Sequence, residues 1–420
     1  MKNYDVIWLD DKYKRCADRL TPVQNSDEAE KIVKEYIEKV WPSCIVTPKS
    51  GLKHGFVTPG GGYDTMWDWD SFFISCGLPD EAREFAIGTS LNFLNFIDPK
   101  TGKPAKNVRS DGTQDPTSEL SHPYPKDAQF SYILGKRYND FSWIEPYYET
   151  LEKTVEWYDK NTLKNGYYVW KMYGCGIDNN PAVYGRPDSS GAGPDLVSFM
   201  YREFIALAKL SKIFGKGKED RYFERAKELK EKVQSDYFDR IDKCFYAIDC
   251  NFETPSVCIQ KVNWITYLKY KSFATVFPLW GGLATKEQAK CMRDLIMNED
   301  EFLSVCGIRS HTKNDPVYNN DASGNPSNWQ GPVWGLSTFL TAYGLARYGY
   351  KQEALEVAGR LIKTFAGDIK ENGGLHEFYD GDNGQPVMRL GFLSWNLLAY
   401  KVMDDLRNGT DCTSEDLLDF

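Results

Sequence analysis

The amino-acid sequence predicts an all-α protein, an (α/α)6 toroid in which inner helices line a central funnel and loops gather at its mouth. Apolar residues recur with the helical spacing i, i+3, i+4 and i+7 over most of the 420 residues. The helical segments follow one another in pairs, roughly a dozen in all, and no Gly-, Ser- or Pro-rich linker divides them. We therefore expect one domain over residues 1–420, with its core at about 25–407. A helical-repeat solenoid is the alternative, although no fixed-period motif recurs.

The helices can be assigned in chain order from this periodicity. The first follows the capping signal Ser26-Asp27. A GKGK turn joins the hairpin formed by 195–215 and 219–238, and Pro332 suits a first helical turn. The expected helices span 28–41, 79–96, 126–138, 142–162, 195–215, 219–238, 285–297, 331–349, 352–369 and 391–406. Short strand-like pieces occur at 166–170, 244–249 and around 305–310.

Composition and charge limit the classes of function. Hydrophobic residues at 41% and charged residues at 26% are typical of a globular protein, and the net charge of −9 disfavours a nucleic-acid partner. The longest apolar runs, such as FATVFPLW, are too short to cross a membrane. Aromatic residues reach 15%, which slightly favours a sugar ligand because their flat faces pack on sugar C–H groups.

The cysteines and histidines predict neither a metal site nor a cofactor. The ten cysteines include no CxxC pair, and the four histidines are dispersed along the chain. We expect mostly reduced, buried thiols. The N-terminal stretch MKNYDVIWLDDKYKR lacks an apolar signal core. The expectation is therefore a cytoplasmic protein, or a periplasmic one if a signal peptide has been removed. The oligomeric state cannot be predicted.

One loop is unusually shaped for a helical protein. In GCGIDNNPAVYGRPD, residues 174–188, glycines and prolines exclude both a helix interior and a central strand. Such a rigid loop can present catalytic side chains, and Asp178 and Asn179 stand at its centre. A plain Asx turn is an equal alternative for this segment alone.

Three further loops combine glycine or proline with tryptophan and acidic groups. GGGYDTMWDWDSFF begins at Gly60 and contains Tyr63 and Trp67. Its WDWD sequence enters a helix, with Asp68 or Asp70 as the expected cap. Its indoles either line a ligand site or are simply buried in the core. NWQGPVWG carries two indoles, Trp329 and Trp334, which can wall a pocket, or one of which can belong to the core.

The fourth loop, GGLHEFYDGDNG, carries Glu377. A lone glutamate in a loop is usually solvated. Glu377 is of interest because Asp178, on a distant loop, offers a second carboxyl group. Two carboxyl groups on different loops of one cleft are what glycoside hydrolysis requires, one as acid and one as base. No GxSxG, P-loop, HExxH or dinucleotide motif supports a rival chemistry.

Taken together and in order, the four loops resemble the motifs of glycoside hydrolase family 63 and its relatives. These relatives include processing α-glucosidases, mannosylglycerate and glucosylglycerate hydrolases and, more distantly, trehalases. WDWDSFF resembles W-x-W-D-S-F, GIDNNP resembles G-M-D-N-S-P, NWQGPVW resembles Y-W-R-G-P-V-W, and HEFYDGDNG resembles H-E-N-Y-D-x-x-x-G. The resemblance spans about residues 55–400.

The resemblance implies an (α/α)6 barrel and an inverting α-glycosidase acting on a small oligosaccharide or glycoside. Asp178 matches the general acid and Glu377 the general base, which implies carboxyl groups about 6.5–9.5 Å apart. We expect a raised pKa for Asp178 and an ionised Glu377. The implied sugar-binding residues are Tyr63, Trp67, Trp69, Asp70, Gln129, Asn179, Trp329, Gln330 and Trp334.

Three positions depart from the family pattern. Gln330 replaces the usual arginine and removes a fixed cation, Asn180 replaces serine, and Asn328 stands where tyrosine is common. These changes put an anionic aglycone such as glycerate in doubt and leave both carboxyl groups intact. The alternative functions are a sugar epimerase or isomerase on the same toroid, a non-catalytic carbohydrate-binding protein, and a lyase.

Overall fold

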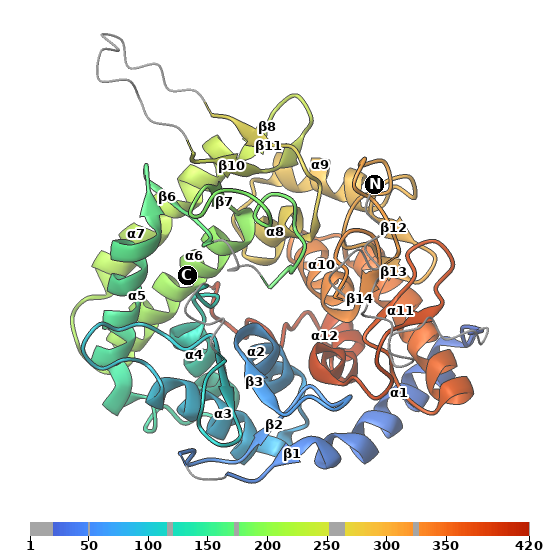
Figure 1. The fold of residues 1–420 in the computed structure, drawn as a ribbon, viewed down its shortest axis with the longest axis horizontal. Coiled ribbons are helices and arrows are strands. Elements are labelled where there is room, and N and C mark those ends of the chain that lie inside the picture. The colour runs from blue at the N-terminus through green and yellow to red at the C-terminus, as the bar shows by residue number, and fades with distance from the viewer. Residues whose placement is uncertain are drawn as a thin grey trace, which may run out of the picture.

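The chain forms a ring of paired helices around a central axis, with one set inside the other (Figure 1). The computed structural model describes residues 20–48, 51–115, 121–171, 176–251, 265–321 and 327–419. The inner ring consists of α2 (Asp68–Gly77), α4 (Asp127–Arg137), α6 (Pro194–Ile213), α8 (Phe277–Trp280), α10 (Gly335–Arg347) and the 3-10 helix η8 (Ser394–Tyr400). The outer helices are α1 (Ser26–Val40), α3 (Arg83–Asn95), α5 (Tyr148–Thr162), α7 (Glu219–Lys232), α9 (Lys286–Ile296) and α11 (Lys351–Asn372).

Burial separates the two rings. Every residue of α2 is buried, whereas α1 buries only Ala29, Val33 and Ile37, one stripe at a spacing of four. The ring closes because α1 packs on α11 and η8 packs on α2. The expected (α/α)6 toroid is therefore confirmed.

Small antiparallel sheets decorate the ring. Two-stranded sheets pair β1 (Ile45–Val46) with β2 (Phe56–Val57), β3 (Thr65–Trp67) with β4 (Asn107–Arg109), β5 (Leu163–Lys164) with β6 (Tyr167–Tyr168), β8 (Phe238–Asp239) with β9 (Cys244–Phe245), and β12 (Leu303–Ser304) with β13 (Gly307–Ile308). Three-stranded sheets contain β7 (Gly191–Ala192), β10 (Ala247–Asp249) and β11 (Tyr267–Leu268), and β14 (Val333–Trp334), β15 (Phe378–Tyr379) and β16 (Pro386–Val387).

Short helical turns and a last helix complete the described secondary structure. Helix α12 (Val402–Asn408) follows η8 and packs on α11. The turns are 3-10 helices at Trp41–Cys44, Asp80–Ala82, Glu145–Tyr147 and Phe273–Val276 and a π-helical turn at Val233–Tyr237.

Three local expectations about helix starts were wrong. The cap of α1 is Asn25, whose side chain accepts from the Glu28 N–H. Pro332 precedes β14, so α10 begins only at Gly335. Helix α2 has no side-chain cap, because the Asp68 carboxylate accepts from the Tyr124 N–H instead, at 2.8 Å. In all three cases a tertiary contact or a neighbouring residue outcompetes the local signal.

The described part of the fold also has features that bear on thiols, metals and membranes. The described cysteines are all free thiols, and of these only Cys291 is not buried. Within the described ranges, no group of His, Cys, Asp and Glu side chains could hold a metal ion. None of the described helices combines the length and apolarity that a membrane crossing needs.

Candidate active site

The loop that carries Asp178, here called the acid loop (residues 176–187), is held close to an indole. A Cβ on Gly176 would lie 2.5 Å from the Trp69 ring, so only glycine allows this approach. Asn180 shapes the next turn, since its side chain accepts from the Ala182 N–H. The neighbouring Ile177 is buried, whereas water reaches the Asp178 side chain. The loop thus anchors its flanks and presents its carboxyl group.

A set of neutral amides, here called the amide network, ties the acid loop to the NWQGPVW segment. Asn179 accepts from the Trp329 N–H at 2.8 Å and donates to Asn328 at 2.9 Å. Gln330 donates to the Asn179 carbonyl at 2.8 Å and accepts from Asn319 at 3.0 Å. Gln330 thus uses both ends of its amide to fix this loop.

Indoles form a continuous wall beside Asp178. Trp329 stacks on Trp334 with centroids 4.1 Å apart and lies 5.5 Å from Trp69. Trp69 in turn stacks on Tyr124 at 5.0 Å. Trp334 has no exposed surface, and its Nε1 donates to the Asn328 carbonyl. Trp329 and Trp69 are buried as well, so the three indoles form one packed cluster.

The loop that carries Glu377, here called the base loop (residues 374–384), is joined to the same wall by a sheet. Strand β15 pairs with β14 in the register Trp334↔Phe378. Behind it, His376 Nδ1 lies 2.9 Å from Asp368 Oδ2, and Tyr379 donates to the same carboxylate at 2.7 Å. Glu377 is consequently fixed between a strand and a buried His–Asp contact, and it is 4% exposed.

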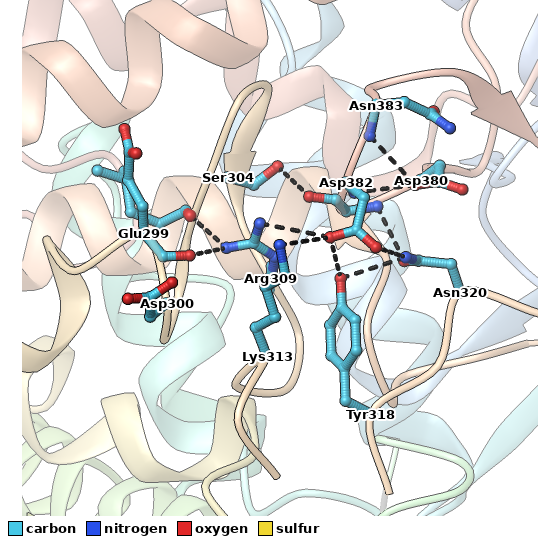
Figure 2. Close-up of polar contacts among 12 residues, drawn as sticks. Glu299, Asp300, Ser304, Arg309, Lys313, Tyr318, Asn320, Asp380, Asp382 and Asn383 are labelled. Atoms are coloured by element: carbon cyan, nitrogen blue, oxygen red, sulfur yellow. Dashed lines mark hydrogen bonds and ion pairs between the residues drawn. The ribbon is translucent and has the colours of Figure 1, made fainter. Parts of the chain in front are cut away.

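The far end of the base loop is fastened by charges, as Figure 2 shows. Asp382 accepts from Tyr318 and from Asn320, both at 2.9 Å. Its carboxylate also lies 3.6 Å from Arg309 and 3.5 Å from Lys313. We call this group the Asp382 latch. It connects the base loop to residues 309–320.

Three carboxyl groups of the site act on one another. Desolvation raises the pKa of Asp178 to about 6, opposed by a hydrogen bond from Ser327 and the charge of Lys106. It also raises the pKa of Glu377 to about 8, where Arg389 opposes and the charges of Asp70 and Asp178 add to the rise. Burial raises the pKa of Asp70 to about 7 against a hydrogen bond from Ser394. The charge of Asp178 thus acts on both Asp70 and Glu377, which is consistent with one shared site.

The pKa directions confirm one expectation and correct another. The pKa of Asp178 is raised, as expected for a proton donor. Glu377 was expected to stay ionised, but its pKa is raised as well, because the side chain is buried beside other acids rather than solvated. In the ligand-free site the carboxyl groups therefore share protons near neutral pH.

Of the other expected binding residues, some lie at this site and one belongs to a separate network. Tyr63 lies beside Glu377, with its hydroxyl 3.3 Å from Oε2. Trp67 is half-buried on β3 opposite Asn107, next to the site residues of α2. Gln129 belongs to a separate buried network, in which its side chain donates to the Pro125 carbonyl and accepts from Arg202. Its polar atoms are thus occupied away from the carboxyl cluster.

Sequence reasoning missed several residues that contribute to the site. Lys106 lies 3.7 Å from Asp68 and acts on Asp178. Arg389 acts on Glu377, and the Ser394 hydroxyl donates to Asp70 at 2.9 Å. Trp395 packs edge-on against Trp69 at 5.6 Å. No motif singles out the two cations, whereas Ser394 and Trp395 follow a glycine in an aromatic segment, which is a weak signal.

Comparisons with known proteins identify the family and agree with the fold. The family model described as the mannosylglycerate hydrolase MGH1-like glycoside hydrolase domain matches residues 108–395. The periplasmic trehalase of Escherichia coli is 20% identical over 440 residues, which cover 89% of this chain and 74% of the trehalase.

Two solved structures share the fold. The family 63 mannosylglycerate hydrolase from Thermus thermophilus, solved with glucose, superposes with a TM-score of 0.66 at 16% identity and covers 88% of this chain and 99% of its own. The neutral trehalase of Saccharomyces cerevisiae superposes with a TM-score of 0.63 at 18% identity, covering 92% and 83%. The chain belongs to the mannosylglycerate hydrolase MGH1-like family of glycoside hydrolases, which is related to the trehalases.

Proposed function

We propose that the protein hydrolyses an α-glucoside or a closely related α-glycoside with inversion at the anomeric carbon. The observation that carries this proposal is the placement of Asp178 and Glu377 on two separate loops that meet the same group of indoles, the acid loop at Trp69 and the base loop through the pairing of Phe378 with Trp334. An inverting glycosidase needs such a pair, with a sugar ring and one water between them.

Asp178 is the general acid in this proposal. Desolvation raises its pKa to about 6, so a fraction of the molecules keeps this proton near neutral pH, and Asp178 is exposed to solvent. It can therefore protonate the glycosidic oxygen as the bond to the anomeric carbon breaks. The amide network fixes the acid loop without placing a competing charge next to the donor.

Glu377 is the general base. In its ionised form it takes a proton from the attacking water, whose oxygen bonds to the anomeric carbon from the opposite face. The Tyr63 hydroxyl and the charge of Arg389 both favour that ionised form. Trp329 and Trp334 are buried and stacked on one another, so they support the site from behind its surface.

Glucose is the proposed sugar, and the proposed leaving group is neutral. The glucose complex of the Thermus thermophilus relative supports the first point. Gln330 supports the second, because an engaged amide replaces the arginine of the family motif and offers no cation to an anionic aglycone.

Proton NMR of the first product tests the stereochemistry. Hydrolysis of an α-glycoside should release the β-anomer before mutarotation equilibrates it. Release of the α-anomer would instead assign Glu377 as a nucleophile in a retaining reaction. A panel of aryl α- and β-glycosides and α-linked disaccharides then identifies the substrate.

The alternative functions are less well supported. An epimerase or isomerase would use histidines to move protons, yet His376 is paired with Asp368 behind the base loop. A non-catalytic sugar-binding protein gains nothing from two desolvated carboxyl groups, whose burial costs stability. Turnover that persists in Glu377→Gln would favour one of these alternatives.

The cytoplasmic location remains a prediction. The relative from Escherichia coli is named a periplasmic trehalase. Fractionation of the native cells, with activity measured in the periplasmic and cytoplasmic fractions, tests it directly.

A further inference from the structure

One cation lies next to the carboxyl group that acts as base. The Arg389 guanidinium covers the Tyr63 ring, with its central carbon 4.2 Å from the ring centroid. It also donates to the Gly61 carbonyl at 3.4 Å. The Tyr63 hydroxyl in turn lies 3.3 and 3.4 Å from the two oxygens of Glu377. The three side chains thus form a layered series from cation to phenol to carboxylate.

The backbone brings this series together from two distant parts of the chain. Gly60, Gly61 and Gly62 all have positive φ, which lets the turn before Tyr63 fold tightly. A Cβ on Gly60 would lie 2.6 Å from the Gly391 carbonyl, so the two segments touch through their main chains. The Tyr63 ring also packs edge-on against Phe392 at 6.0 Å. The glycine run therefore docks Tyr63 against the segment that carries Arg389.

The charges around Glu377 give this contact its chemical importance. Asp70 on α2 and Asp178 on the acid loop raise the pKa of Glu377, as desolvation does. Arg389 is the strongest influence in the opposite direction, followed by the hydrogen bond from Tyr63. Without a cation here, the shared protons of the cluster would move toward Glu377, the group that must be ionised.

We propose that Arg389 is a positioning residue for catalysis, which holds Tyr63 against Glu377 and supplies the positive charge that keeps this carboxylate available as a base. The inference rests on the proposed function of Glu377 and assigns a role to a residue outside every sequence motif. Arg389 does not touch the reacting atoms. It acts on Glu377 by holding Tyr63 in place and through the electrostatic field of its positive charge.

The test measures the titration of Glu377 separately from activity. Protein labelled with 13C at the glutamate side-chain carboxyl carbon is titrated by NMR, and Glu377→Gln identifies the signal. In Arg389→Gln we expect the midpoint of Glu377 to rise by about one unit or more, with kcat/KM at pH 6–7 falling about tenfold for each unit. KM at the pH optimum should change much less than kcat.

A matched control is Arg293→Gln. Arg293 also lies over a tyrosine ring, that of Tyr350, at 5.1 Å, but it belongs to the outer helix α9. Its substitution should change neither the titration midpoint of Glu377 nor kcat/KM. An unchanged Glu377 midpoint in Arg389→Gln would overturn the inference, whatever the activity.

Two further variants distinguish a direct effect on Glu377 from misfolding of Arg389→Gln. Arg389→Lys keeps the charge, so the midpoint should stay near that of the wild type. Tyr63→Phe removes the hydroxyl, so the midpoint should rise. Wild-type midpoints in both Arg389→Gln and Tyr63→Phe would reject the layered series. A shifted midpoint combined with full turnover in Glu377→Gln would overturn the proposed function, and with it the catalytic role of Arg389, while the charge pairing would stand.

Discussion

The acid loop and the base loop bring one carboxyl group each to the same site, but they are built differently. Neutral amides, those of Asn179 and Gln330, hold the acid loop next to Asp178, and an ion pair of Arg186 with Asp249 holds its far end. Two acidic side chains hold the base loop, Asp368 through its contact with His376 at the start and Asp382 through the Asp382 latch at the end. Water reaches Asp178, whereas Glu377 is buried.

The difference has a physical reason. A proton donor must keep a raised pKa, and neutral amides fix its loop without adding a positive charge that would ionise it. A base must give up its proton although it is buried, and this requires a cation close by, here Arg389. Both carboxyl groups have a cation that opposes the rise in pKa, Lys106 for Asp178 and Arg389 for Glu377, so the main difference lies in the groups that fix the two loops.

Removal of either carboxyl group should have the largest effect. Asp178→Asn and Glu377→Gln should each lower kcat by several orders of magnitude with a smaller change in KM. A glycosyl fluoride, whose leaving group needs no proton, should restore much of the rate in Asp178→Asn but not in Glu377→Gln. Equal rescue of both variants would contradict the assignment of Asp178 as the acid and Glu377 as the base.

The pH dependence of kcat/KM should be bell-shaped with its maximum near pH 7. Toward low pH the rate falls because the pair becomes doubly protonated and no base is left, and toward high pH it falls because the pair loses both protons and no acid is left. The two limbs should lie near the values of about 6 and about 8 that desolvation gives Asp178 and Glu377. Because the groups interact, the limbs belong to the pair rather than to single residues. A rate that still rises above pH 9 would contradict the assignment.

The amide network should matter more than its lack of charge suggests. Asn179→Ala removes the acceptor of the Trp329 N–H and should lower kcat/KM about 10- to 100-fold by displacing the acid loop. The control is Asn161→Ala, which removes a side-chain amide bonded to the Trp157 carbonyl on the outer helix α5. Similar losses of kcat/KM in both variants would show that the effect does not depend on the contact of Asn179 with the acid loop.

The Asp382 latch should respond to salt, unlike the amide network. Asp382 is 43% exposed, so salt screens its attraction to Arg309 and Lys313. Asp382→Asn should lower kcat/KM up to about tenfold at low ionic strength. The deficit should shrink near 0.5 M salt, about where screening becomes strong. The deficit of Asn179→Ala should remain, and parallel salt curves for the two variants would remove the distinction between the loops.

The smallest expected effect concerns stability. The pKa of Asp70 is raised to about 7, so the folded state binds its proton more tightly than the unfolded chain does. That stabilising contribution is complete at pH values below the unfolded pKa of about 4 and is lost as the pH rises through 7.

Asn cannot ionise, so Asp70→Asn should be more stable than the wild type at pH 8, by about 1–3 kcal/mol. The gain should shrink toward pH 5. Melting curves across this range measure it, with the exposed Asp300→Asn as control. A gain that is independent of pH would show that Asp70 is not desolvated in the folded protein.

The sequence determined the fold class, the family and the two loops with their carboxyl groups. Helical periodicity is a local property, and it persists in the folded protein as buried inner and amphipathic outer helices. The motif around Asp178 is also local, since glycine and proline set its shape. The strand-like segments at 166–170 and 244–249 contain β6, β9 and β10, and the segment around 305–310 contains β13.

Only the tertiary structure decided which side chains surround these carboxyl groups. Arg389 and Lys106 are ordinary residues in the sequence, and they become important only because distant segments fold beside Glu377 and Asp178. The raised pKa of Glu377 is likewise a consequence of burial next to Asp70, which belongs to a distant part of the chain. Gln129 shows the converse, because packing between helices uses up its amide. Desolvation and long-range charge depend on what lies nearby in space, which the order of residues does not state.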